Sequence, residues 1–184
     1  MLDVVSMHQL HFTLRDAVKD FFWKCHDEPC EGSFYYQMDF LEHKTLPMGP
    51  DESSDWWYAT NVLGLTVLVI YVWSKGKVPA FHVYCSHCRD QSAAFVIACL
   101  RDLHNKLNVK AYSRHVMFAD VGSHFRNGYT LNYWCKEMLA LQGICETDWI
   151  HFPEGHGKGM CDAQGGRMTS WFDIILMECV RGFT

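Results

Sequence analysis

The sequence predicts an α/β fold, in which a mixed sheet of five strands is flanked by helices. β-prone segments separated by short turns come first, and segments with helical spacing alternate with strands afterwards. The 184 residues are 49% hydrophobic and only 20% charged, which is typical of a globular body with a substantial core. We therefore expect one domain over residues 1–184, with a helical extension over 1–30 and a core over 31–180.

The first half of the chain predicts one helix and three strands. Leu14, Val18, Phe21 and Phe22 recur at the spacing of a helix face. Short turns between the strands, such as "SKGK" at 74–77, favour antiparallel pairing. The expected strands are "SFYYQMDF" at 33–40, one long strand or two joined at Gly64 within 56–73, and "VPAFHVYC" at 78–85.

Helices and strands alternate in the second half of the chain. Asp90 is the expected N-terminal cap of the first of these helices. Alternation of this kind indicates parallel pairing, so the expected sheet has three antiparallel strands followed by two parallel ones. The predicted order is a helix over 91–107, a strand over 114–120, a helix over 127–142, a strand over 148–152 and a helix over 165–180.

Acidic residues stand at the ends of two predicted strands and at the start of the last helix. These residues are Asp39, Asp120 and Asp162. An acid at such a place is commonly only a turn former or a helix cap. If the three converge, their carboxylates repel one another unless cations lie between them, and hard oxygen ligands suit Mg²⁺ or Mn²⁺. Two such ions can clamp a phosphodiester and activate a water molecule.

A second unusual feature is "HFPEGHGKGMCDAQGG" at 151–166, which holds more glycine and charge than a turn requires. Its glycines allow the backbone to approach a phosphate closely, Lys158 adds a positive charge, and His156 can donate a hydrogen bond. The alternative is a glycine-rich connection without a ligand. "GSHFRNG" after Asp120 supplies His124 and Arg126 for related contacts, although His124 also suits a helix cap.

The predicted element order is that of the ribonuclease H-like fold, although other α/β folds share it. In that fold the strands that end on Asp39 and Asp120 are neighbours. The segments "YYQMDF", "FADVGSHFRNG" and "HFPEGHGKGMCDAQGG" resemble the three acidic blocks of DDE/D-type transposases. More narrowly, they resemble a eukaryotic group of transposase-derived proteins in which Gly-His-Gly-Lys-Gly precedes an acid. The resemblance extends from about Leu14 to about Arg167 and covers most of the chain.

The resemblance implies a nuclease or transposase core that cleaves DNA with two Mg²⁺ or Mn²⁺ ions. It assigns Asp39, Asp120 and Asp162 to the metal ions, with Glu154 as the alternative third acid. Two departures stand out: Ala119 replaces a common Ser, and "RMTS" replaces a basic pair, which leaves Arg167 alone there. The residues expected to contact the substrate are His124, Arg126, His156, Lys158 and Arg167.

Partners and location follow from the same expectations. DNA is the expected partner, RNA stays open, and either a homodimer or a second protein would supply the specificity for a DNA sequence. The net charge of −5 and the missing basic pair favour an alternative, a domesticated domain that binds without catalysis. The first residues include Asp3 and lack a basic stretch, and no apolar run is long enough to cross a bilayer. We therefore expect no membrane association and an intracellular, nuclear location.

The nine cysteines raise the question of a structural zinc ion. "KCHDEPC" and "YCSHC" each supply two closely spaced cysteines. Joined, the two pairs would form a tetrahedral site. The alternative is that they are ordinary buried or surface thiols. The candidate zinc ligands are Cys25, Cys30, Cys85 and Cys88.

Overall fold

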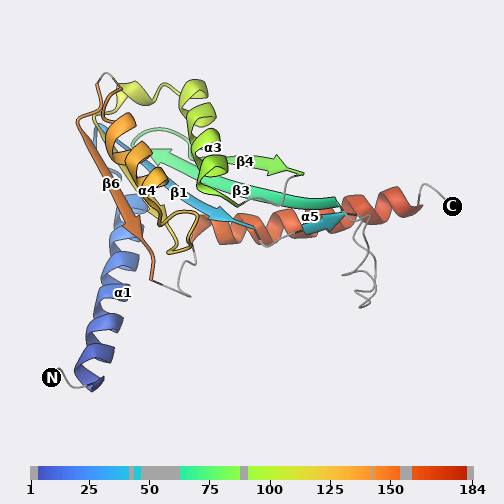
Figure 1. Cartoon of the computed structure of the whole chain (residues 1–184), viewed down its shortest axis with the longest axis horizontal. Coiled ribbons are helices and arrows are strands. Elements are labelled where there is room, and N and C mark those ends of the chain that lie inside the picture. Colours follow the sequence, from blue (N-terminus) through green and yellow to red (C-terminus); the bar gives the residue numbers. More distant parts are fainter. Residues whose placement is uncertain are drawn as a thin grey trace.

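The computed structural model shows an α/β fold built on a mixed sheet that is flanked by helices (Figure 1). It describes residues 4–41, 44–46, 63–87, 91–141, 143–153 and 159–181, and it describes side chains from residue 15 to residue 171 within these ranges, except at 44–46 and 63. The predicted fold class, a mixed sheet with helical cover, is confirmed.

The sheet contains six strand segments in the order β2-β3-β1-β5-β6, with β4 also paired to β3. β1 pairs with residues 68–74 of β3, and β2 pairs with residues 63–65 of the same strand. β2 therefore extends the row of pairs that β1 makes with β3. Without β2 the sheet has the five strands that were expected. The strands are β1 (Ser33–Phe40), β2 (Lys44–Leu46), β3 (Leu63–Ser74), β4 (Ala80–Ser86), β5 (Arg114–Ala119) and β6 (Glu146–His151).

Strand directions agree with the expectation of antiparallel strands followed by parallel ones. β1 and β4 both pair with β3 in antiparallel register, with Asp39 opposite Val69 and Cys85 opposite Val67. β1 also pairs with β5 in parallel register, and β5 pairs with β6 in the same way. Because parallel strands end at the same edge of a sheet, the carboxyl ends of β1, β5 and β6 lie together there.

Helices cover both faces of the sheet (Figure 1). α3 and α4 pack on one face, and α1 and α5 pack on the other. Because both faces of the central strand β1 are covered, "SFYYQM" is buried throughout. A strand in such a place is apolar at most positions. The helices are α1 (Val4–Asp27), α3 (Ala93–Lys106), α4 (Gly128–Asn132) and α5 (Met160–Arg181), with a 3₁₀ turn at Val109–Ala111 and a π-helical turn at Tyr133–Glu137.

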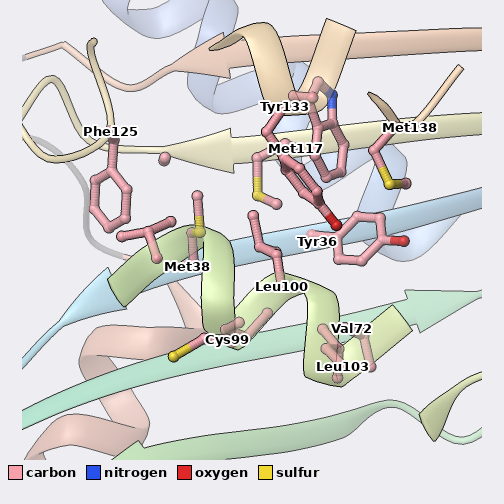
Figure 2. Close-up of a cluster of buried hydrophobic side chains, with 14 of the residues drawn as sticks. Tyr36, Met38, Val72, Cys99, Leu100, Leu103, Met117, Phe125, Tyr133 and Met138 are labelled. Atoms are coloured by element: carbon pink, nitrogen blue, oxygen red, sulfur yellow. The ribbon is translucent and has the colours of Figure 1, made fainter. Parts of the chain in front are cut away.

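The core on the α3 and α4 face is formed by alternate residues of the strands and by one side of each helix (Figure 2). Met38 of β1 and Met117 of β5 are buried there, beneath Leu100 of α3 and Trp134 of the π-helical turn. Phe125 is buried with no exposed surface and anchors the loop that follows β5. This packing fixes the loop that carries Asp120 onto the sheet.

The core on the opposite face is aromatic. Phe22 of α1 is 1% exposed and contacts the rings of Trp73, Phe118 and Phe152 edge to face. The second half of α1 is therefore packed against the sheet. The division of the chain into a helical extension and a core remains a prediction.

The ends of several elements differ from those expected. Ser92, instead of Asp90, caps α3, because its hydroxyl accepts a hydrogen bond from the Phe95 N–H. The helix expected over 127–142 is a five-residue α-helix followed by a π-helical turn, and α5 begins at Met160 instead of residue 165. Asp90 and residues 56–62 of the long predicted strand lie outside the described residues.

Candidate functional site

Asp39 occupies the penultimate position of β1, in the middle of the sheet. Its side chain shares a face with those of Tyr35 and Gln37, because successive side chains of a strand alternate between faces. This is the face on which α1 and α5 pack. Asp39 is partly buried, so its carboxyl group lies between the apolar core and the edge of the sheet.

Asp120 directly follows β5, on the strand next to β1. Met38 pairs with Ala119, so Asp39 and Asp120 are each one residue past that pair on adjacent parallel strands. Two contacts hold Asp120 in place. The Gly122 N–H donates to its Oδ1 at 2.8 Å, and the ring N–H of His151 donates to its carbonyl oxygen at 2.7 Å. The neighbouring strand β6 thus helps to fix the acid.

Asp162 lies in the first turn of α5, as expected for an acid that begins the last helix. Its Oδ2 accepts a hydrogen bond from the Gly159 N–H at 2.8 Å. The next residue back, Cys161, is fully buried against β1 and β3 and donates through Sγ to the carbonyl oxygens of Gln37 and Val69. Because Val69 pairs with Asp39, the start of α5 lies directly beside Asp39.

The pKa of Asp39 reflects its burial and its proximity to the other two acids. Its pKa is raised from 3.8 to about 7, first by burial and then by the negative charges of Asp120 and Asp162. Burial also raises the pKa of the Cys161 thiol, and the charges of Asp39 and Asp162 add to that effect. The structure therefore brings Asp39, Asp120 and Asp162 together at one end of the sheet, and we call these three residues the acidic cluster.

His124 is the only histidine predicted to contact substrate that the described residues include. Its Nε2 lies 3.8 Å from Asp120 Oδ1 and has no hydrogen-bond partner among the described residues, although the atom is buried. Phe40 and Phe125 hold the ring edge to face, at centroid distances of 4.7 Å and 4.3 Å. Burial lowers the pKa of His124 and Asp120 opposes that effect, so the ring is a neutral polar group aimed at the acidic cluster.

Two of the predicted basic contacts, Arg126 and Arg167, are exposed on elements that also carry a member of the acidic cluster. Arg126 is exposed on the loop after β5, four residues beyond Gly122, to whose carbonyl its N–H donates. Arg167 is exposed on α5, five positions or about 1.4 turns beyond Asp162. Glu154, His156 and Lys158 lie outside the described residues, so the choice between Glu154 and Asp162 as the third acid rests on the placement of Asp162 alone.

The acidic cluster suits a hard divalent cation by its chemistry, because carboxylate oxygens are the ligands that Mg²⁺ and Mn²⁺ prefer. One oxygen each of Asp120 and Asp162 is already held by a backbone N–H, which leaves the other oxygen of each. Within the described residues, no group of three or more His, Cys, Asp or Glu is arranged closely enough to hold an ion as it stands. Side-chain rotation of these acids would be needed to close a coordination sphere, and there is room for it because Asp162 is exposed and Asp120 is partly exposed.

The described members of the two cysteine pairs predicted to hold zinc are not brought together. Cys25 lies at the Trp73 end of β3, since the Trp73 indole donates to its carbonyl oxygen, whereas Cys85 pairs with Val67. Six residues of β3 separate Trp73 from Val67, which is ~20 Å at the usual strand rise. A zinc ion needs its sulfur ligands at about 2.3 Å, so Cys25, Cys30 and Cys85 do not share one site. Cys88 lies outside the described residues.

Three residues that support the acidic cluster were not among the predicted site residues: Gln37, Gly122 and His151. Gln37 carried a signal, because it is the one amide in the apolar and aromatic strand "SFYYQMDF". Gly122 is needed where it is, since a Cβ there would lie 2.6 Å from the His124 ring and 2.9 Å from Asp120 Oδ1. No sequence pattern indicated a role for His151, because only strand pairing places it beside Asp120.

Comparison with known proteins gives a family and no function. A family described as a domain of unknown function (DUF8701) matches residues 18–172. Neither the curated proteins nor the solved structures contain a match to the chain. Among the described helices, none has the length and apolarity needed to cross a membrane.

Proposed function

Because the chain belongs to the DUF8701 family, whose description leaves its function unknown, we propose a function from the acidic cluster. The protein is the core of a transposase-type polynucleotidyl transferase or nuclease, and it cleaves phosphodiester bonds in DNA. The fold is of the ribonuclease H-like kind. Mg²⁺ or Mn²⁺ ions bound at the acidic cluster would supply Lewis acidity and an activated water.

The observation that carries this proposal is the convergence of Asp39, Asp120 and Asp162, which are far apart in the sequence. The pKa of Asp39 is raised to about 7, first by burial and then by the negative charges of Asp120 and Asp162, which disfavour its charged form. A fold has little reason to assemble such repulsion unless a cation relieves it. The order of the strands supports the same proposal, since β1 lies between β3 and β5 as the ribonuclease H-like fold requires.

The remaining residues of the site would hold and orient the nucleic acid. Arg126 and Arg167 are exposed, on the loop after Asp120 and on the helix that carries Asp162, and would contact phosphates. His124 would donate or accept a hydrogen bond next to Asp120, because its buried Nε2 has no other partner among the described residues. Gly122 and His151 keep Asp120 in place while a phosphate binds.

Cleavage of labelled DNA in Mg²⁺ or Mn²⁺ tests the proposal. Asp120→Asn should lower the rate about a hundredfold or more, since losing a metal ligand removes several kcal/mol of transition-state stabilisation. Asp102→Asn is the matched control, because Asp102 is an acid on α3 that bonds Tyr84 and Lys106. The same assay on RNA decides between the two nucleic acids. Equal cleavage by the wild-type protein and the Asp120→Asn variant would exclude the proposed site.

A non-catalytic module derived from a transposase is the second candidate. It is favoured by the net charge of −5 and by the absence, within the described residues, of a group already shaped to hold a metal ion. Such a domain would bind DNA or a protein and would not bind Mn²⁺ at the acidic cluster. Measured Mn²⁺ binding therefore separates the two candidates independently of any DNA substrate.

A further inference from the structure

Gln37 is a buried polar residue in the most apolar part of the sheet. It lies on β1 and is 1% exposed. Its Oε1 accepts hydrogen bonds from two backbone N–H groups, that of Met160 at 2.8 Å and that of Cys161 at 3.4 Å. These groups belong to the first turn of α5, where N–H groups have no partner within the helix. The Gln37 side chain therefore caps α5 from the sheet.

The contact is reciprocal. Cys161 donates through Sγ to the carbonyl oxygen of Gln37 at 3.2 Å. Gly159 lies so close to the Gln37 amide that a Cβ at this position would overlap it. Gly159 also donates its N–H to Asp162. One amide side chain thus contacts the segment 159–161 that immediately precedes Asp162.

Burial of the Gln37 amide is energetically unfavourable, so packing alone does not account for a glutamine at this position. Burying an amide without hydrogen bonds is unfavourable, and an apolar side chain of the same size avoids that cost. The Oε1 of Gln37 offsets that cost through its bonds to Met160 and Cys161, so the position of Gln37 and that of α5 are fixed together. Two residues beyond Gln37 on the same face lies Asp39, and one residue beyond Cys161 lies Asp162.

We propose that Gln37 is a positioning residue that holds the carboxylate of Asp162 beside that of Asp39. It acts through the backbone of Met160 and Cys161 and does not itself touch a metal ion or a substrate. The use of the positioned acid in metal binding rests on the proposed function. The anchoring of α5 by Gln37 does not depend on it.

Gln37→Met tests the anchor, because methionine has nearly the same size and accepts no comparable hydrogen bond. Amide hydrogen exchange in the metal-free protein should show at least a tenfold loss of protection at Met160 and Cys161. Leu103→Ala is the control for general destabilisation, since Leu103 is fully buried on the opposite face of the sheet. Unchanged protection at both amides in Gln37→Met would overturn the proposal.

Gly159→Ala provides a second variant that perturbs the same contact and leaves Gln37 intact. Gly166→Ala is its matched control, because a Cβ at Gly166 meets nothing within 4 Å. Gly159→Ala should lower Mn²⁺ affinity about tenfold, the size of effect typical of residues that orient metal ligands. Gly166→Ala should leave the affinity unchanged. Equal affinities in the two variants would contradict the proposal.

A double-mutant cycle shows whether Gln37 acts through Asp162. Gln37→Met alone should lower Mn²⁺ affinity about tenfold, and it should have almost no further effect in the Asp162→Asn protein. Additive losses would mean that Gln37 acts by another route, which refutes the positioning role. If the wild-type protein binds no Mn²⁺, the proposed function fails, and hydrogen exchange at Met160 and Cys161 still decides whether Gln37 anchors α5.

Discussion

The backbone N–H of Gly122 donates a hydrogen bond to Asp120 Oδ1 at 2.8 Å, close to the ring of His124. This bond closes a tight turn at the end of β5 and sets the direction of the Asp120 carboxylate. A side chain at Gly122 would contact both Asp120 and His124, so the turn depends on glycine for space and not for a left-handed backbone.

Gly122→Ala should therefore disturb the acidic cluster more than it disturbs the fold. The added Cβ would force Asp120 and His124 apart, and Mn²⁺ affinity or DNA cleavage should fall at least tenfold, as with other residues that orient metal ligands. Gly128→Ala is the control, because Gly128 lies six residues further along the chain and a Cβ there would meet nothing within 4 Å. Isothermal titration with Mn²⁺ measures both variants, and equal affinities would show that Gly122 has no role at the site.

Binding of Mn²⁺ should stabilise the protein against heat. A ligand at about 100 times its dissociation constant adds about 2.7 kcal/mol to the free energy of unfolding. For a chain of this size that corresponds to a rise in Tm of about 5–10 °C. Asp162→Asn should remove most of the rise, whereas Glu137→Gln should retain it, since Glu137 is bound to Arg101 on the surface. A Tm that does not change when Mn²⁺ is added would favour the non-catalytic module.

Asp39 should make the metal-free protein less stable at alkaline pH than at acidic pH. Its pKa is raised from 3.8 in the unfolded chain to about 7 in the folded protein, so the folded state binds the extra proton between these values. That stabilisation is complete below pH 4 and is lost as the pH rises through 7. Asp39→Asn should therefore raise the free energy of unfolding at pH 8, by at most about 4 kcal/mol at 1.36 kcal/mol per pKa unit.

Urea unfolding without metal at pH 8 and pH 4 measures this effect. The gain from Asp39→Asn should be present at pH 8 and absent at pH 4. With saturating Mn²⁺ the sign should reverse, because the ion stabilises the charged carboxylate that the variant lacks. A gain that is equal at both pH values would show that repulsion among the acids is not its cause.

Two buried histidines should make the protein sensitive to acid. Burial lowers the pKa of His104 to about 3 and that of His115 to about 4. Their ring nitrogens bond Tyr133 and Tyr36 at 2.9 Å and 2.8 Å, and His104 Nε2 has no partner among the described residues. The unfolded chain takes up protons below about pH 6.5, so the stability that these residues contribute is lost as the pH falls from 6.5 toward 4.

The expected loss at pH 4.5 relative to pH 7 is about 2 kcal/mol for each histidine. His104→Gln and His115→Gln should each reduce this difference, measured by urea unfolding at the two pH values. His26→Gln is the control, since His26 is a partly exposed histidine near the C-terminal end of α1 that bonds Asp27 and Tyr71. A pH dependence that neither core variant alters would place the acid sensitivity elsewhere.

Much of the fold was predictable because local sequence determines local structure. The apolar run of β3 and the stripe of α3 identify those elements at almost any position in a fold, since their periodicity is set by strand and helix geometry. Element ends were less predictable. Both Asp90 and Ser92 are good caps in isolation, and the packing of Val96 and Leu100 against the sheet selects the helix that begins at Ala93.

The site was predictable in part and for a different reason. Asp39, Asp120 and Asp162 were identified because each stands at the end of a predictable element, and they do converge. Gln37 and His151 act through neighbours more than 30 residues away in the sequence, so no local pattern identifies their roles. The zinc prediction was wrong for Cys25, Cys30 and Cys85, because spacing within each pair contains no information on the distance between the pairs.

The sequence by itself determined most of the strands and helices, the apolar stripes that they bury and where the acids stand along the chain. Only the tertiary structure decided which strands are neighbours, that α5 is capped by Gln37, and that the acids share one end of the sheet. The physical reason is that periodicity and capping are set by residues a few positions apart. Strand order depends instead on how the two faces of the sheet are buried by α1, α3, α4 and α5 together.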